Sequence, residues 1–453
     1  MHNNTIAAIS TPTGSGGIGI IRISGDDSIN IADKVFKSIS GKKLQDLKGY
    51  QAAFGKVQWN GEDIDNAVAL VFRNPKSYTG EDVVELSVHG GSFVLKEVLR
   101  AVLEAGAVSA SGGEFTRRAY LNGKLDLMEA EAVMGIISAE GKTASRAALA
   151  LHDGAAHGKI AKIKASLLEA AAGLAVFSDY PDDELPEFSD DTLLSALNSA
   201  KSDLEELLKT YDAGKILREG VDTVIAGRPN VGKSTLMNLL SGCKRSIVTS
   251  IAGTTRDIVE ETVLLKDIKL RLSDTAGLRD TTDEVEKIGV SLSREKINSA
   301  GLILAVFDRS EVENEEDLSL IEICKERPSV AIINKNDLES KFDESKLGDI
   351  PKVIISAKNQ DSLSEIEDAV ALVCGLHSLD GSETVLCSER QRNCCSAALK
   401  YINEAISVMQ GGFTLDAVGV CIDDALTELL SLTGERVTNA VVDEVFSKFC
   451  VGK

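Results

Sequence analysis

The residues most clearly suited to chemistry form a phosphate-binding loop. Gly227-Arg228-Pro229-Asn230-Val231-Gly232-Lys233-Ser234 fits the pattern G-x-x-x-x-G-K-[ST]. Glycines let such a backbone curl so that its N–H groups face phosphates, Lys233 offers a positive charge to the β- and γ-phosphates, and Ser234 can ligate Mg²⁺. The apolar run Val221 to Ala226 predicts a strand before the loop, and Leu236 to Leu240 predicts a helix after it. The sequence therefore predicts a nucleoside triphosphate site.

Three later motifs make guanine the expected base. Asp274-Thr275-Ala276-Gly277 follows the apolar run Ile268 to Leu272, so its carboxylate can hold Mg²⁺ through water and its glycine amide can meet the γ-phosphate. Asn334-Lys335-Asn336-Asp337 offers a carboxylate to guanine N1–H and the exocyclic amine, a pair of donors that adenine lacks. Ser356-Ala357-Lys358 completes the base pocket. In this order the motifs resemble G1, G3, G4 and G5 of small GTPases.

The group that activates water is less obvious from these motifs. Ras-like switches place a Gln after the glycine of the third motif, but here that residue is Leu278. Either hydrolysis is slow or another group acts, and the polar segment that follows offers Arg279, Asp280, Asp283, Glu284 and Glu286. For any one of these residues, a role as a solvated loop charge is the alternative.

Composition limits how the chain could contact nucleic acid. The 453 residues carry 49 Lys and Arg against 70 Asp and Glu, a net charge of −21. Because phosphate binding depends on cationic side chains that release counterions, this excludes a basic sheath for nucleic acid. Aromatic residues make up only 4% of the chain, so stacking platforms for single strands are scarce as well.

Cysteine spacing and the first residues indicate the compartment. None of the eight cysteines forms a CxxC pair, so they are expected to be reduced thiols. Met1 to Ser10 has no basic region of a signal peptide, and no apolar run approaches the roughly 20 residues that span a bilayer. We expect a soluble, cytoplasmic protein.

The pattern of apolar residues predicts a multidomain chain with an inserted domain. Residues 1–120 mix strand-like runs, among them Val83 to Val88, with a helix that stops at Gly106, which indicates an α+β domain. Residues 121–217 and 377–453 have helical periodicity, whereas strands alternate with helices in residues 218–376, as in a parallel α/β domain. In the first helical segment one long amphipathic stripe is formed by Leu193, Leu197, Leu204 and Leu208, with Leu194 and Leu207 beside them. The simplest interpretation is an α/β domain inserted into a helical one. Four consecutive domains would leave about 75 residues to bury the last apolar stripe alone.

Beyond the nucleotide motifs, the sequence resembles one family, MnmE, also called TrmE, the tRNA modification GTPases. The matching stretches span the chain: Gly14 to Gly25, Tyr78 to Asp82, Gly113 to Lys124, Gly227 to Ser234, Ile251 to Asp257, Asp274 to Arg279, and Phe449 to Lys453. The resemblance implies a folate-binding N-terminal domain that dimerises, a helical domain and a Ras-like G domain. It also implies a complex with MnmG, an FAD- and NADH-using protein. Together the family's proteins attach an aminomethyl or carboxymethylaminomethyl group to C5 of the wobble uridine (U34) of certain tRNAs, with the methylene carbon supplied by a tetrahydrofolate such as 5-formyl- or methylene-tetrahydrofolate.

The resemblance also implies a K⁺ ion in place of an arginine finger. Its ligands would be Asn230, Thr249, Ile251 and Thr254, Mg²⁺ would be held by Ser234 and Thr255, and Glu286 would orient the attacking water through a second water. The full set of GTP-binding residues implied by the family is Asn230, Val231, Gly232, Lys233, Ser234, Thr235, Thr249, Ser250, Ile251, Ala252, Gly253, Thr254, Thr255, Asp274, Thr275, Ala276, Gly277, Asn334, Lys335, Asp337, Ser356, Ala357 and Lys358.

Folate binding is expected at Arg22, Glu85, Lys124 and Lys453, which match the family's positions. A pteridine needs a carboxylate for its ring N–H edge, and its glutamate tail needs cations. Without the family, Arg22 and Glu85 would be interpreted as solvent-facing strand residues. Cys450 is either a catalytic thiol or, by the favoured interpretation, a small packed residue. The sequence departs from the family at Ala110-Ser111-Gly112, where relatives usually carry a Pro.

A second hypothesis is a regulatory GTP switch or ribosome-assembly factor, because Era- and EngA-like proteins share the loop sequence. Those proteins usually append an RNA-binding domain after the G domain. A pull-down separates the two hypotheses, since a flavoprotein partner supports the first and ribosomal particles the second. The negative charge further predicts that the chain alone binds tRNA weakly, and better with MnmG present.

Overall fold

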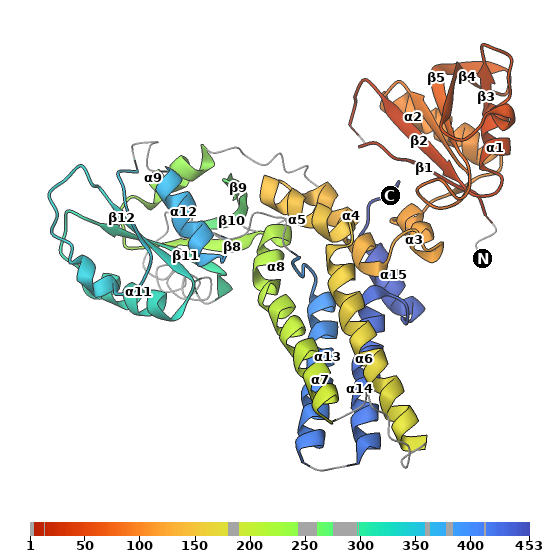
Figure 1. Ribbon diagram of the computed structural model, residues 1–453. Helices are drawn as coiled ribbons and strands as arrows, with labels where there is room; N and C mark the ends of the chain where they lie inside the picture. Colours follow the sequence, from red (N-terminus) through yellow and green to blue (C-terminus); the bar gives the residue numbers. More distant parts are fainter. Residues whose placement is uncertain are drawn as a thin grey trace, which may run out of the picture. The chain divides into compact units, whose positions relative to one another are not determined.

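The computed structural model describes residues 4–12, 14–179, 190–242, 261–274, 297, 299–357, 363–376, 384–411 and 414–453 (Figure 1). Two compact units emerge. Unit 1 contains Met1–Met134 and Leu430–Lys453, and unit 2 contains Gly135–Leu429. The boundaries fall within α4 (Leu127–Ser138) and α14 (Leu415–Thr433). The beginning and the end of the chain therefore fold together.

Unit 1 is built on a seven-stranded sheet in the order β3-β4-β5-β6-β2-β1-β7. Its strands are β1 (Ile6–Ile9), β2 (Gly19–Ser24), β3 (Phe36–Ser38), β4 (Gln51–Trp59), β5 (Glu62–Phe72), β6 (Val83–Val88) and β7 (Val108–Ser109). All neighbours are antiparallel except β1 and β7. The predicted strand Val83 to Val88 coincides with β6.

Helices α1 (Ser28–Val35) and α2 (Ser92–Glu104) bury apolar stripes in the same core as this sheet. In α2 the buried residues Leu95, Val98 and Val102 recur at helical spacing, as the sequence predicted. A short 3₁₀ helix, η1 (Leu44–Asp46), packs near α1. Residues 1–120 thus combine strands and helices in the α+β arrangement expected from the sequence.

The C-terminal segment packs on the N-terminal part of unit 1. Helix α15 (Asn439–Ser447) contacts α3 (Glu114–Leu121), and the residues that follow it form a bridge between Val451 and Gly112. The amides of Gly113 and Phe115 donate to the carbonyls of Cys450 and Lys453, both at 3.2 Å. Unit 1 is therefore closed by residues that are more than 300 positions apart in sequence.

Gly452 makes this docking possible. Its φ of 97° lies in the region that L side chains rarely adopt, and a Cβ built there would lie 2.4 Å from the carbonyl oxygen of Ile9. The Gly452 carbonyl accepts a hydrogen bond from Ser10 Oγ at 3.1 Å. Only a residue without a side chain brings the chain end this close to β1.

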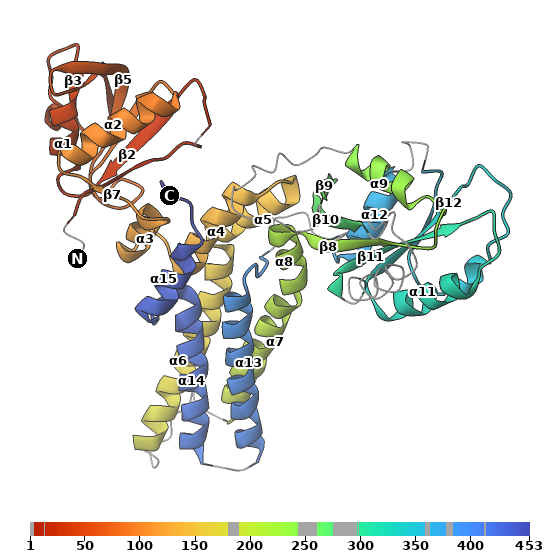
Figure 2. The same ribbon diagram turned by 180° about the vertical axis from the view of Figure 1, so that it is seen from behind.

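Four long helices of unit 2 lie side by side, as Figures 1 and 2 both show: α6 (Ala155–Asp179), α7 (Asp190–Lys209), α13 (Glu389–Gln410) and α14. Helix α7 packs on both α6 and α13, so helices from before and after the α/β segment share one bundle. The apolar stripe of α7 is buried at Leu193, Leu197 and Leu204, as predicted. Its last member is Leu207 rather than the expected Leu208, because 3.6-residue periodicity turns position 207 toward the core. Two shorter helices, α5 (Lys142–His152) and α8 (Tyr211–Glu219), also belong to unit 2.

The rest of unit 2 is an α/β domain with a six-stranded sheet in the order β13-β12-β11-β8-β10-β9. The strands are β8 (Val221–Ala226), β9 (Glu261–Leu265), β10 (Ile268–Asp274), β11 (Leu302–Asp308), β12 (Ser329–Asn334) and β13 (Lys352–Ile354). Only β9 runs antiparallel to its neighbour. The predicted strand Val221 to Ala226 is β8, at an interior position of the sheet.

Helices cover both faces of this sheet, which explains why β11 and β12 are buried along their whole length. Helices α9 (Lys233–Ser241) and α12 (Leu363–Val373) share one hydrophobic core with the sheet, and α11 (Glu315–Glu326) shares another. A short 3₁₀ helix, η2 (Glu344–Leu347), lies beside α11. The predicted fold class, with an α+β part, helices and a P-loop α/β part, is confirmed.

Replacement of Gly452 by Ala is expected to release the C-terminal segment. An L side chain in this left-handed backbone conformation costs about 1–2 kcal/mol, and the new Cβ would also clash with the Ile9 carbonyl oxygen. Hydrogen exchange at the amides of Gly113 and Phe115 should therefore become faster. Gly41→Ala is the matched control, because Gly41 has a φ of 74° but nothing within 4 Å of its Cβ position. Equal exchange in the two variants would contradict this account of the docking.

Candidate nucleotide and folate sites

The phosphate-binding loop connects β8 to α9, as the sequence predicted. Gly232 precedes the first helical residue with a φ of 103°, and a Cβ there would lie 2.1 Å from Asn334 Nδ2. The Lys233 ammonium donates to the carbonyls of Gly227 at 2.7 Å and Arg228 at 2.9 Å. These two bonds hold the ammonium against the loop at the start of α9, where helix N–H groups favour an anion. Ser234, the candidate Mg²⁺ ligand, is exposed on the same turn.

Asn334 ties three of the four motifs together. The side chain is only 4% exposed, its Nδ2 donates to the Val231 carbonyl at 2.8 Å, and its Oδ1 accepts from the Ala357 amide at 2.9 Å. One buried amide thus bridges the phosphate loop and the segment expected to complete the base pocket. The arrangement brings Asn334, Val231 and Ala357 into contact although they are far apart in sequence.

The remaining base-pocket residues lie next to this bridge in sequence. Asp337 Oδ1 accepts from Ser356 Oγ at 3.1 Å. This hydrogen bond joins the motif that begins at Asn334 to the motif that begins at Ser356. Lys335 has a φ of 66° and forms an ion pair with Asp308 at the end of β11. Asn336 is exposed, and its backbone N–H donates to the Ile355 carbonyl. These contacts set Asp337 beside Ser356 as the proposed guanine pocket requires.

Asp308 belongs to this site although sequence reasoning missed it. Its carboxylate is 3% exposed and accepts from Ser310 N at 2.9 Å and Ser310 Oγ at 2.7 Å, in addition to Lys335. Burial raises the pKa of Asp308, but the hydrogen bonds from Lys335 and Ser310 outweigh it, so the pKa lies below its ordinary value. The available signal was a charged residue at the end of a fully apolar strand.

Several expected nucleotide and ion ligands lie outside the described residues. These are Thr249, Ser250, Ile251, Ala252, Gly253, Thr254, Thr255, Thr275, Ala276, Gly277, Glu286 and Lys358. Asp274 is described as the last residue of β10, at the edge of the sheet where β8 leads into the phosphate loop. Asn230 is exposed in that loop with a φ of 65°, a backbone conformation that Asn tolerates better than most residues.

In unit 1 the structure brings three of the four predicted folate residues together. Arg22 and Glu85 are partners on β2 and β6, and Arg22 Nε donates to Glu85 Oε1 at 2.8 Å. Arg22 Nη1 also reaches the Gly452 carbonyl at 3.5 Å. Lys453 lies close enough that the charges of Arg22 and Glu85 act on it. The chain end thus meets the sheet at the predicted Arg–Glu pair.

The charge of Lys453 is influenced by its surroundings in unit 1. Partial burial and the neighbouring charge of Arg22 lower the pKa of its ammonium, and Glu85 only partly offsets them. Among the described residues, no carboxylate forms an ion pair with it.

Lys124, the fourth predicted residue, is held elsewhere in unit 1. Its ammonium donates to the Pro75 carbonyl at 3.2 Å, and its side chain passes 3.4 Å from the position of a Cβ on Gly80. No described interaction joins it to the other three residues. The peptide bond between Asn74 and Pro75 is cis.

Two aromatic residues next to Arg22 were not singled out by sequence reasoning. The guanidinium lies 5.5 Å from the ring centroids of both Tyr78 and Phe115. Tyr78 Oη lies 2.8 Å from Thr116 Oγ1, and burial raises the pKa of the phenol.

The Cys450 side chain is exposed, so the favoured interpretation of a packed residue is not met within this chain.

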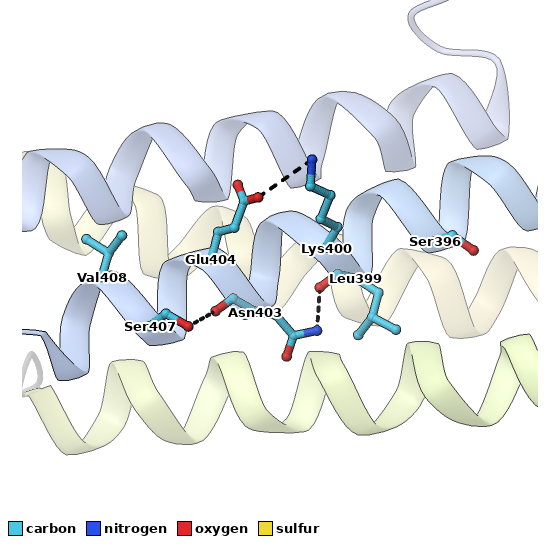
Figure 3. Close-up of a pocket in the computed structure, with 7 residues that line it drawn as sticks. All are labelled: Ser396, Leu399, Lys400, Asn403, Glu404, Ser407 and Val408. Atoms are coloured by element: carbon cyan, nitrogen blue, oxygen red, sulfur yellow. Dashed lines mark hydrogen bonds and ion pairs between the residues drawn. The ribbon is translucent and has the colours of Figure 1, made fainter.

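A surface hollow of about 560 Å³ lies on α13 and shares no residue with either set (Figure 3). It is lined by Ser396, Leu399, Lys400, Asn403, Glu404, Ser407 and Val408, all from one face of that helix. Figure 3 shows Lys400 paired with Glu404 along the helix. None of these residues was predicted as a site.

In the part of the chain that the structure describes, no helix is both long and apolar enough to cross a membrane.

Comparison with known proteins gives matches over nearly the whole chain. A family model described as the MnmE helical domain matches residues 127–450, and one described as the GTP-binding protein TrmE N-terminus matches residues 5–124. A tRNA modification GTPase MnmE of Alkaliphilus oremlandii is 40% identical over 100% of this chain and 99% of its own length. The corresponding protein of Clostridioides difficile is 38% identical over 100% of this chain and 99% of its own length. That of Bacillus subtilis is 38% identical over 99% of this chain and 100% of its own length.

Replacement of Asn334 by Ala should lower the affinity for GDP by at least about tenfold. The change leaves the Val231 carbonyl and the Ala357 amide without their partner, and each buried unsatisfied group costs about 1–3 kcal/mol. Titration with a fluorescent GDP analogue measures the affinity. Asn336→Ala, in the same motif but exposed, is the control and should change affinity far less. Similar losses in both variants would show that the bridge has no special role.

Proposed function

The chain belongs to the MnmE family of tRNA modification GTPases, and we propose that it is a K⁺-activated GTPase that modifies wobble uridine together with MnmG. The product would carry an aminomethyl or carboxymethylaminomethyl group at C5 of U34, with a one-carbon unit taken from a tetrahydrofolate. The single observation that carries the nucleotide half is the Asn334 bridge, which assembles the phosphate loop and the base pocket. The substrates, GTP and tRNA, place the proposed activity in the cytoplasm.

GTP would bind with its phosphates on the loop Asn230 to Thr235 and its base against Asn334, Lys335, Asp337, Ser356, Ala357 and Lys358. Two features of the described residues support this assignment. Lys233 is held against the loop by two carbonyls, and the Asp337 carboxylate is positioned by Ser356. The segment Thr249 to Thr255, together with Asp274, Thr275, Ala276 and Gly277, would complete the γ-phosphate side.

The described residues fit two metal ions of different character. The exposed Ser234 hydroxyl at the start of α9 fits Mg²⁺, which prefers hard oxygen ligands, and Thr255 would be the second protein ligand. The exposed Asn230 amide offers an oxygen for K⁺, with Thr249, Ile251 and Thr254 as further ligands. When bound, K⁺ supplies positive charge between the phosphates, the role that an arginine finger has elsewhere. Glu286 would orient water, since Leu278 cannot.

The folate proposal rests on the charges at the chain end. A folate has a pteridine edge that donates to a carboxylate and a tail of carboxylates. Glu85 provides the acceptor, and Arg22 with the partly buried Lys453 provides cations for the tail. An ammonium has three N–H donors, so Lys124 could keep its bond to the Pro75 carbonyl while it binds a ligand. The exposed Cys450 thiol adjoins this region in sequence.

Partners are proposed from the family and from charge. The N-terminal domain would form a homodimer, and MnmG would bind to make a heterotetramer or a larger complex. With a net charge of −21, this chain offers little attraction to the tRNA backbone, so MnmG would supply much of that contact.

GTP hydrolysis should be faster in K⁺ than in Na⁺ buffer, on the order of tenfold or more, because one well-placed positive charge stabilises the transition state by several kcal/mol. Asn230→Gly removes the amide oxygen while accepting the left-handed φ of 65°. In this variant the rates in the two buffers should become equal. Equal rates in the wild-type protein would sink the proposal of K⁺ activation.

Glu85→Gln should lower the affinity for 5-formyl-tetrahydrofolate by about tenfold or more. A hydrogen bond to a charged acceptor is worth about 1.5–3 kcal/mol, and the substitution keeps the size of the side chain. Equilibrium dialysis measures the affinity. Glu104→Gln is the control, because Glu104 is an exposed carboxylate of the same unit, paired with Arg100. If the two variants bind the folate alike, Glu85 is not part of the site.

Nucleoside analysis of tRNA tests the proposed function as a whole. Cells that lack this protein should contain wobble uridine without the C5 group, and the wild-type chain should restore it. A chain with Lys233→Ala should not restore it. Unchanged wobble uridine in the deletion strain, with ribosomal particles instead of a flavoprotein in a pull-down, would favour the assembly-factor hypothesis.

A further inference from the structure

The side chain of Arg228, the second residue of the phosphate loop, is not directed at the phosphate site but pairs with carboxylates near α11. Its Nη2 lies 2.7 Å from Glu311 Oε2. Its Nε lies 3.3 Å from Asp317 Oδ2 in an ion pair that is not a hydrogen bond, because this buried Nε has no hydrogen-bond partner among the described residues. The guanidinium is largely buried, with 14% of the side chain exposed. Among the motif residues this arginine had no assigned role, because the pattern G-x-x-x-x-G-K-[ST] accepts any residue at its position.

Asp317 is a buried carboxylate that caps α11 and forms an ion pair with Arg228. Asp317 Oδ2 accepts the Asn314 amide at 3.2 Å, and Asn314 Oδ1 accepts the Asp317 amide at 3.0 Å, which together cap α11. The residue is 2% exposed, and its Oδ1 has no hydrogen-bond partner. Burial raises its pKa, and the Arg228 charge opposes that shift. Without the arginine, a carboxylate would remain buried with too little compensation.

The backbone of the same arginine holds the phosphate-binding lysine. The Arg228 carbonyl accepts from Lys233 Nζ at 2.9 Å. The orientation of that carbonyl depends on the backbone of Arg228, whose side chain is anchored at its far end by Glu311 and Asp317. A continuous set of contacts therefore runs from the cap of α11 through Arg228 to the ammonium of Lys233.

We propose that Arg228 and Asp317 form a positioning pair that sets the phosphate loop, and with it Lys233, for nucleotide binding. Arg228 acts here through its own carbonyl and not through contact with a phosphate. Because Asp317 fixes the guanidinium and α11 fixes Asp317, the loop is already ordered before the nucleotide arrives, and less conformational entropy is lost on binding. The inference rests on the proposed assignment of this loop as the phosphate site.

The test is a double-mutant cycle on the full chain, with affinity for a fluorescent GDP analogue as the readout. Arg228→Gln should weaken binding about tenfold. Asp317→Asn keeps a side chain able to cap α11 but removes the charge that holds the arginine, and should weaken binding by a similar factor. The double variant should bind no more weakly than either single variant, within about twofold, since each change breaks the same contact.

Two controls separate positioning from general loss of stability. Leu320→Ala removes a buried side chain from α11 and lowers the free energy of unfolding without touching the loop, so its folded form should bind the GDP analogue as the wild type does. Lys325→Gln removes a positive charge from an exposed pair on the same helix and should also leave affinity unchanged. Circular dichroism establishes that each variant is folded.

Three outcomes would be decisive. If Arg228→Gln and Asp317→Asn lower stability but bind the analogue as tightly as the wild type, the pair is merely structural and the inference is wrong. If Arg228→Gln weakens binding while Asp317→Asn has no effect, Arg228 acts without Asp317 and the positioning pair is also wrong. Lys233→Ala tests the proposed function separately, because it removes the lysine of the phosphate loop itself. Wild-type affinity in that variant would overturn the assignment of the loop itself.

Discussion

The return of the chain end to the first strands is the constraint on which the rest of the fold depends. The carbonyls of Cys450, Gly452 and Lys453 accept hydrogen bonds from Gly113, Ser10 and Phe115. Because these bonds join the two ends in unit 1, all of unit 2 lies between segments that must stay together. They also carry Lys453 to the Arg22–Glu85 pair, so the proposed folate site exists only when the chain is closed.

Each of the two units uses a buried polar side chain to join segments that are separate in sequence. In unit 2 this is Asn334, with bonds to Val231 and Ala357. In unit 1 Arg118, 3% exposed, binds Glu81 at 3.2 Å, and Glu81 in turn accepts from Ser24 at 2.7 Å. Buried polar groups are tolerated only when they are hydrogen-bonded, so each network favours one arrangement of its loops. Exposed polar groups such as Ser234 and Asp337 in unit 2 can then be presented on fixed supports.

Sequence reasoning succeeded where the pattern is local. The runs Val83 to Val88 and Val221 to Ala226 are strands with those bounds, and the phosphate loop lies between β8 and α9 as expected. It missed Asp308 and the side-chain role of Arg228, because their partners are 27 and 89 residues further along the chain. Such contacts depend on the order of strands in the sheet, which periodicity does not encode. The meeting of Lys453 with Arg22 was expected from the family resemblance and not from any pattern in the residues.

The most direct test of the account is binding of two ligands to a chain shortened by its last three residues. Val451 to Lys453 contribute to unit 1 and make no part of the nucleotide site in unit 2. The account predicts that the shortened protein loses 5-formyl-tetrahydrofolate binding while its affinity for GDP stays that of the full chain. Unchanged folate binding would contradict the central claim that the chain end completes the folate site.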